Sequence, residues 1–259
     1  METPSGPPPA SDATTQREGF DARVSGIASL GEPVRRALYR YVVTRSSPVN
    51  RDQAAEGAGV ARHVAKFHLD KLVDDGLLAT EFGRPPGRGG PGAGRPAKLY
   101  RRSSRELEVS LPDRRYDFAG ALLARAVTDA ERDGTPVREA LALAAREAGL
   151  SLGAEARARA GTRPAGKALV AAAREVLQEL GYEPRLEPGG LELANCPFHA
   201  LAEHFAQLVC GMNLELMTGM VAGLGNPGLD ARLDPGPGLC CVRIRQRPRP
   251  ASEAAGARG

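Results

Sequence analysis

The chain has 259 residues, of which 42% are hydrophobic and only 4% aromatic, with no tryptophan. This length suggests one large or two ordinary domains with a core of leucine, alanine and valine. The formal net charge of +4 is a modest basic excess, which suits a nucleic-acid partner without requiring one. No run of about 18 apolar residues and no secretory signal pattern is evident, so we expect no membrane span and a cytoplasmic protein.

The composition divides the chain into two blocks between two tails. Residues 1–19, rich in proline, serine and threonine, and residues 246–259 are predicted to be disordered. The first block covers residues 20–105 and the second covers residues 113–245, with Pro112 near the junction. We therefore expect a two-domain protein with short unstructured ends.

The first block has the periodicity of four short helices followed by two strands. Pro33 suits the first position of a helix, Asn50 suits an N-cap, and Gly76 suits the end of the last helix. The helices are expected at 21–28, 33–44, 51–57 and 61–74, and the strands at 77–81 and 98–101. The apolar residues of the fourth helix are Val64, Phe67, Leu69, Leu72 and Val73. His68 lies among them, so we expect it to be partly buried and not a ligand.

The helices at 51–57 and 61–74 are joined at a glycine turn, and the second carries polar and basic side chains. This pattern is typical of a helix-turn-helix, in which the second helix lies in the major groove of double-stranded DNA. Arg62, His63 and Lys66 occupy its N-terminal positions, which lie nearest the bases. Arginine and lysine can donate to guanine or to phosphate, so these residues are candidate DNA contacts.

A basic, glycine- and proline-rich segment follows the helix pair. Residues 81–105 hold seven basic residues and one acidic residue. A hairpin tip of this composition would bring Arg84, Arg88, Arg95 and Lys98 to phosphates or to a minor groove. Because strands flank the tip and the helix pair precedes it, the segment has the layout of a wing.

The run HVAKFHLDKLVDDGLL, followed by GRPAKLY, resembles ArsR/DeoR-type winged helix-turn-helix repressors, and among these the SufR-like iron–sulfur group. The resemblance covers about residues 25–105. It implies a transcription regulator that acts as a homodimer on inverted repeats of DNA.

The second block reads as helices over a small antiparallel sheet, so the predicted fold class is α+β, with an N-terminal winged helix-turn-helix and a C-terminal sensor domain. The expected helices cover 117–133, 136–148, 165–180 and 197–224, and the expected strands cover 182–187, 191–195, 231–234 and 239–245.

All four cysteines, Cys196, Cys210, Cys240 and Cys241, lie in the last quarter of the chain. The SufR-like resemblance implies that Cys196, Cys210 and one of Cys240 or Cys241 hold an iron–sulfur cluster. Thiolates are soft ligands that suit iron–sulfur clusters and equally zinc, which remains the alternative metal. Four buried thiols with no metal are a further possibility, because free cysteine packs as a small hydrophobe.

The spacing of Cys196 and Cys210 raises a geometric objection to a shared cluster. On one straight helix the two would be about 21 Å apart, because each residue rises roughly 1.5 Å. Sharing a cluster therefore requires a break, for which 204–207 is the best place, although no proline or glycine there forces one. If the helix is continuous, Cys210 would instead meet Cys240 or Cys241.

The remaining ligands are open. Cys240 and Cys241 would face opposite sides of a strand, so we expect only one of them to ligate. His199 or His204 is a possible additional ligand.

The sequence leaves other functions open, one of which is a structural or interaction module without DNA binding. The second block could also enclose an apolar pocket for a small organic ligand, lined by Met212, Leu216, Met217 and Met220, with structural cysteines. Catalysis is not expected, because the chain has no phosphate-binding loop, nucleophile elbow or HExxH motif.

Overall fold

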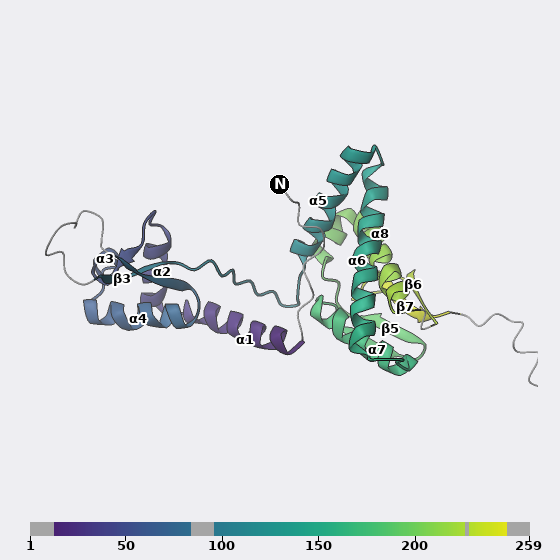
Figure 1. Cartoon of the computed structure of the whole chain (residues 1–259), viewed down its shortest axis with the longest axis horizontal. Coiled ribbons are helices and arrows are strands. Elements are labelled where there is room, and N and C mark those ends of the chain that lie inside the picture. The colour runs from purple at the N-terminus through teal and green to yellow at the C-terminus, as the bar shows by residue number, and fades with distance from the viewer. Residues whose placement is uncertain (1–12, 84–95, 226–227, 248–259) are drawn as a thin grey trace, which may run out of the picture. The chain divides into compact units, whose positions relative to one another are not determined.

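The computed structural model describes residues 13–83, 96–225 and 228–247. Its chain divides into two compact units (Figure 1), one of residues 14–109 and one that begins at Ser110. We call them the N-terminal unit and the C-terminal unit. The predicted contacts Arg84, Arg88 and Arg95 lie outside the described residues.

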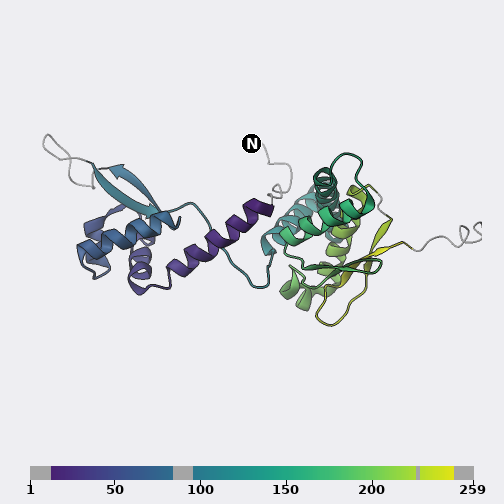
Figure 2. The ribbon, with the colours of Figure 1, turned by 90° about the horizontal axis from the view of Figure 1, so that it is seen from below.

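The N-terminal unit combines four helices with a three-stranded sheet. Its elements are α1 (Ala13–Ser29), α2 (Pro33–Val43), β1 (Val49–Asn50), α3 (Arg51–Gly57), α4 (Arg62–Asp74), β2 (Leu78–Gly83) and β3 (Ala97–Arg102). All pairings are antiparallel in the order β1-β3-β2, and β2 and β3 run side by side in Figure 2. The sequence predicts no strand at β1, because a two-residue segment has no alternating pattern to detect.

Helix α1 begins at Ala13, which corrects the predicted disorder of residues 13–19. The prolines of the N-terminal stretch end at Pro9, and the residues from Ala13 onward include good helix formers. Proline restricts the residue before it and lacks an amide donor, so a helix can start only beyond that stretch.

The core of the N-terminal unit lies between α2, α4 and the sheet. Leu38 and Val42 of α2, Leu69 and Leu72 of α4 and Tyr100 of β3 are almost fully buried there. Leu38 and Val42 are four residues apart and therefore lie on one face of α2. Leu69 and Leu72 pack against this face, so one side of α4 is buried in the core and the opposite side faces solvent.

The C-terminal unit contains four helices and a four-stranded sheet. Its elements are α5 (Tyr116–Asp133), α6 (Val137–Arg159), α7 (Gly166–Glu179), β4 (Pro184–Glu187), β5 (Gly190–Leu193), α8 (His199–Gly223), β6 (Leu229–Leu233) and β7 (Val242–Gln246). The sheet is antiparallel in the order β4-β5-β7-β6. Gln246 pairs with Leu229, so the ordered strand runs one residue into the predicted tail.

Helix α6 runs eleven residues beyond the predicted end at Ala148. Gly149 follows the predicted end and Gly153 lies one turn later, yet both are buried within α6. A Cβ at Gly149 would lie 2.0 Å from the carbonyl oxygen of Leu216, and one at Gly153 would lie 2.1 Å from that of Met220. These glycines therefore let the backbones of α6 and α8 approach each other, and their helix cost is offset by packing.

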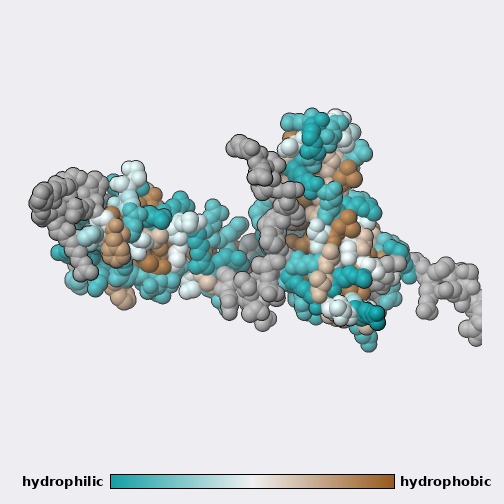
Figure 3. All heavy atoms as spheres, in the orientation of Figure 1, coloured by the Kyte–Doolittle hydropathy of each residue, from teal (hydrophilic) through white to brown (hydrophobic). Residues whose placement is uncertain are grey.

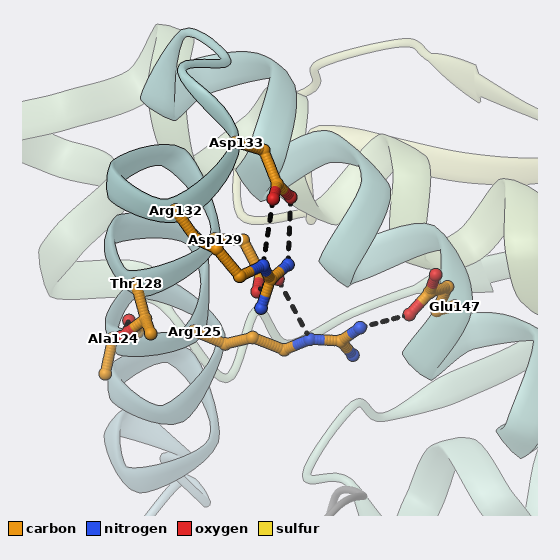
Figure 4. A network of polar contacts seen from close by, with 7 residues as sticks. All are labelled: Ala124, Arg125, Thr128, Asp129, Arg132, Asp133 and Glu147. Carbon is orange, nitrogen blue, oxygen red and sulfur yellow. Dashed lines mark hydrogen bonds and ion pairs between the residues drawn. The ribbon is translucent and has the colours of Figure 1, made fainter.

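Charged side chains join α5 to α6 on the exposed surface (Figure 4). Arg125 of α5 pairs with Asp129 one turn later, at 3.4 Å, and with Glu147 of α6. Arg132 binds both carboxylate oxygens of Asp133 at 2.9 Å. Exposed ion pairs of this kind each contribute about 0–1 kcal/mol to stability, so most of the stability of the α5–α6 packing comes from buried contacts.

Among the described residues one helix, α8, has the length and apolar composition that could cross a membrane, which the sequence prediction did not anticipate. Met212, Leu216, Met217 and Met220 of α8 are buried in the core of the C-terminal unit. This burial accounts for the composition of the helix. The four side chains considered as the lining of an apolar pocket thus belong to the core of the C-terminal unit.

Candidate functional site

Helix α3 starts where the predicted N-cap stands. The side chain of Asn50 accepts a hydrogen bond from the backbone N–H of Gln53 at 2.9 Å, and the side chain of Gln53 accepts one from the N–H of Asn50 at 2.9 Å. This reciprocal capping satisfies two amide donors that the first turn would leave unpaired. Asn50 also pairs with Leu99 of β3, so the same residue ties α3 to the sheet.

The connection between α3 and α4 is tight and depends on its glycines. Gly59 adopts a φ of +67°, a left-handed conformation that favours glycine. A Cβ at Gly57 would overlap the ring of Tyr41 on α2. Ala54 of α3 and Ala65 of α4 are fully buried, so small side chains let the two short helices pack closely.

The exposed face of α4 carries the predicted DNA contacts. Arg62, His63 and Lys66 are all exposed, and Arg62 also pairs with Asp52 of α3. The prediction that Phe67 belongs to the inward apolar face is wrong, because its side chain is 67% exposed. Ala65 and Leu69 occupy the inward stripe instead, and Phe67 projects from the same outer surface as Lys66.

The hairpin β2–β3 is fastened to α4 through one carboxylate. Asp70 accepts hydrogen bonds from the Lys98 ammonium at 2.7 Å and from the Tyr100 hydroxyl at 3.1 Å. Burial opposes ionisation of Asp70, but these two hydrogen bonds outweigh it and hold the pKa of the carboxyl below its ordinary value of 3.8. Lys98, predicted as a DNA contact, thus also positions the hairpin relative to the helix.

His68 is partly buried, as predicted, and contacts the cap of α2. Its Nδ1 lies 3.5 Å from a carboxylate oxygen of Glu32. Glu32 in turn accepts hydrogen bonds from the backbone N–H groups of Val34 at 3.1 Å and Arg35 at 2.6 Å. His68 therefore helps to hold α2 against α4, which is a structural role.

The N-terminal unit thus contains two helices, α3 and α4, joined by a glycine turn. The second helix is exposed on one face and is followed by the strand pair β2–β3. Residues 30–81 match the family model of a helix-turn-helix domain. No curated protein and no solved structure matches the chain.

The fold is therefore α+β with an N-terminal helix-turn-helix domain, as predicted, and β2–β3 lies where a wing follows the recognition helix. This domain supports a DNA-binding transcription regulator more than an enzyme.

The four cysteines of the C-terminal unit come from three segments. Cys196 follows β5, Cys210 lies within α8, and Cys240 and Cys241 directly precede β7. The backbone N–H of Cys240 donates to the carbonyl of Leu193 at 2.9 Å, so the segment before β7 lies against the end of β5. The sheet thus brings Cys240 beside the segment that carries Cys196.

The break that a shared cluster would require is present in α8. Phe205 has φ −130° and ψ 45°, values that lie outside the helical region and fall within the expected segment 204–207. Cys196 also precedes the helix, which starts at His199. The straight-helix separation of the two cysteines therefore does not apply.

The four thiols lie next to one another in a row, with Cys196 beside Cys240, Cys240 beside Cys241, and Cys241 beside Cys210. The expectation that Cys240 and Cys241 face opposite sides of a strand is wrong. The strand β7 begins only at Val242, and Cys241 lies in a bend, so the pleat does not govern these two side chains.

Hydrogen bonding and burial raise the pKa of three of these thiols, Cys196, Cys210 and Cys240. The hydrogen bond with Cys240, followed by burial, raises the pKa of Cys196 well above its usual range. Burial raises the pKa of Cys210, although its hydrogen bond with Cys241 opposes this. Hydrogen bonding with Cys196 lowers the pKa of Cys240, but the contact with Cys241 and burial outweigh it and raise that pKa to about 11.

Two polar residues that the sequence analysis missed support Cys240 in the core. The side-chain amide of Asn213 donates to the Cys240 sulfur at 3.1 Å, and the hydroxyl of Tyr182 donates to the carbonyl oxygen of Asn213. Asn213 is 1% exposed and lies in an otherwise apolar stretch of α8. A polar residue in such a stretch is the available signal, because a buried amide requires partners.

The thiols suit a soft metal by their chemistry, but they do not form a ready single-ion site. Within residues 13–83, 96–225 and 228–247, no group of three or more histidine, cysteine or acidic side chains has the geometry to hold a metal ion. The histidines considered as further ligands are exposed, with His199 pairing at 3.3 Å with Glu203 and His204 stacking edge-on beside Phe205. Any soft-metal ligand set in this unit therefore rests on the four cysteines.

Proposed function

We propose that the protein is a cytoplasmic transcription regulator, most simply a repressor, which binds double-stranded DNA as a homodimer. The observation that supports this is the outer face of α4, where Arg62, His63 and Lys66 are exposed together in a matched helix-turn-helix domain. Basic side chains on this face would contact phosphates and base edges in the major groove. A dimer would present two such faces to two half-sites about one helical turn apart.

A salt series with the full chain tests DNA binding. The expected result is binding to a pool of random duplexes that weakens as the salt concentration rises, because phosphate contacts release counterions. Lys66→Ala should weaken binding and reduce the slope of log affinity against log salt by about one. The matched control, Lys167→Ala, removes the same charge from the exposed surface of the C-terminal unit and should leave the slope unchanged.

We further propose that the four cysteines are the sensor, holding an iron–sulfur cluster of the kind implied by the SufR-like resemblance, with zinc as the alternative. The gathering of Cys196, Cys210, Cys240 and Cys241 from three segments supports this. A bound cluster would supply electron-transfer chemistry and a covalent link between these segments. The conformational change caused by cluster binding would then be transmitted through α8. The break at Phe205 separates the first turns of this helix from the part that packs on α6.

The cluster proposal has a direct chemical test. Iron and sulfide should be found in anaerobically purified protein, and Cys→Ser at each of the four positions should reduce both. Operator affinity should differ between loaded and metal-free protein, since a ligand can switch the protein only by binding its two states differently. Zinc without sulfide would favour the alternative metal, and equal operator affinities would remove the sensor while leaving DNA binding intact.

A further inference from the structure

Phe67 is a large apolar side chain on the outer surface of α4. It is 67% exposed in the middle of α4. Successive helical residues turn by about 100°, so Phe67 lies about 200° around α4 from the fully buried Ala65. It therefore projects almost directly away from the core. Its ring stacks edge-on beside the His68 ring, with 5.1 Å between the centroids.

The neighbours of Phe67 define what this surface can meet. Lys66 precedes it, and His63 lies one helical turn before it, both exposed. Asp70, the carboxylate on the following turn, is already paired with Lys98. The surface around the phenyl ring is thus basic, which is complementary to a polyanion, and Figure 3 shows hydrophobic residues scattered among hydrophilic ones in the view of this unit.

The major groove offers an apolar ring one characteristic partner. Each base edge presents hydrogen-bond donors or acceptors there, and the C5-methyl group of thymine is the apolar exception. A phenyl ring has no polar atom with which to satisfy the other edges. Placing it against them would remove water from donors and acceptors without replacing their hydrogen bonds.

We propose that Phe67 is a specificity-determining residue of α4 that packs on the C5-methyl group of a thymine in the operator. The inference rests on the proposed DNA-binding function and adds to it one position of the recognised sequence. Lys66 and Arg62 supply affinity through charge, whereas Phe67 selects a thymine at the base pair that it faces. In a dimer the selected thymine occurs once in each half-site.

The test starts from duplexes that the full-length wild-type chain selects from a random pool. Each thymine is then replaced singly by deoxyuridine, which differs only by the missing methyl group. Burying one methyl group is worth about a fourfold change in affinity, so one position per half-site should weaken wild-type binding by about that factor. Phe67→Ala should bind the thymine and deoxyuridine duplexes equally.

Two further variants separate the methyl contact from general effects. Phe67→Leu retains an apolar side chain and should retain part of the preference for thymine, whereas Lys66→Ala should weaken binding to both duplexes by the same factor. A 5-methylcytosine placed at the selected position should bind wild type better than cytosine does, and this gain should vanish in Phe67→Ala. Circular dichroism should show Phe67→Ala to be folded, because the ring is mostly exposed.

The outcomes distinguish a failure of the proposed DNA binding from a failure of thymine selection by Phe67. If wild type shows no salt-dependent DNA binding, the proposed function and this inference both fail. If wild type binds DNA but no deoxyuridine substitution weakens it, or if Phe67→Ala keeps the fourfold preference, the inference alone is overturned.

Discussion

The close approach of α6 and α8 predicts that alanine will be harmful at one glycine of α8 and harmless at another. A Cβ at Gly219 would lie 2.1 Å from the carbonyl oxygen of Arg146, whereas a Cβ at Gly211 would have nothing within 4 Å. The first substitution must push the two helix backbones apart, and overpacking of this kind costs about 1–3 kcal/mol. The second relieves the helix of a glycine, which should stabilise it by about 0.5–1 kcal/mol.

Urea unfolding followed by far-ultraviolet circular dichroism measures both changes in the full chain. Gly219→Ala should lower the free energy of unfolding of the C-terminal unit by about 1–3 kcal/mol, and Gly211→Ala should raise it slightly. In thermal unfolding each kcal/mol corresponds to about 2–4 °C for a unit of this size. Because both glycines lie in α8 and receive the same methyl group, helix propensity cannot explain opposite signs. Equal shifts in the two variants would refute the close-packed arrangement of α6 and α8.

Three further predictions concern buried or paired polar groups. Asp70→Asn removes a negative charge from α4 and frees Lys98, so the slope of log affinity against log salt should steepen by about one and the N-terminal unit should lose about 0.5–1 kcal/mol of stability. The control Asp74→Asn changes an exposed carboxylate and should leave the unfolding midpoint unchanged. If both variants were destabilised equally, the Asp70–Lys98 pairing would be contradicted. Although burial opposes it, hydrogen bonding holds the pKa of Asp70 below 3.8. The stability that the pairing contributes is therefore complete above the unfolded pKa of about 3.9 and is lost as the pH falls through the lower folded pKa. A pH series of unfolding free energies should show that Asp70→Asn loses less stability in acid than wild type does. Asn213→Leu should cost about 1–3 kcal/mol in unfolding experiments because it leaves the buried Tyr182 hydroxyl unpaired, and adding Tyr182→Phe should restore part of that loss, whereas strictly additive losses would argue against the hydrogen bond.

The elements of the N-terminal unit were largely predictable because their signals are local. Asn50 caps α3 through a residue three positions away, and the inward stripe of α4 follows a simple helical repeat. Phe67 was misplaced because an apolar residue next to an apolar stripe looks like part of it. Only the folded structure shows which side of α4 is covered by α2 and the sheet, and Phe67 lies on the other side, facing solvent.

The cysteines illustrate a different boundary between sequence and structure. Their restriction to the last quarter of the chain and the need for a break in α8 could be inferred from spacing alone. That Cys240 and Cys241 each contact another thiol could not, because it depends on where β7 begins and how the segment before it lies against β5. Asn213 reaches Cys240 across 27 residues of sequence, and no local pattern encodes such a contact.

The sequence by itself therefore determined the α+β class, the helix pair with its hairpin and the concentration of thiols at the C-terminal end, since caps, periodicity and composition act over a few residues. The tertiary structure alone decided which glycines end a helix and which join two helices. Gly149 and Gly153 read as breakers in isolation, but the facing carbonyl oxygens of α8 leave no room for a side chain there. Glycine is permissive in both settings, and only the distance to a segment far along the chain distinguishes them.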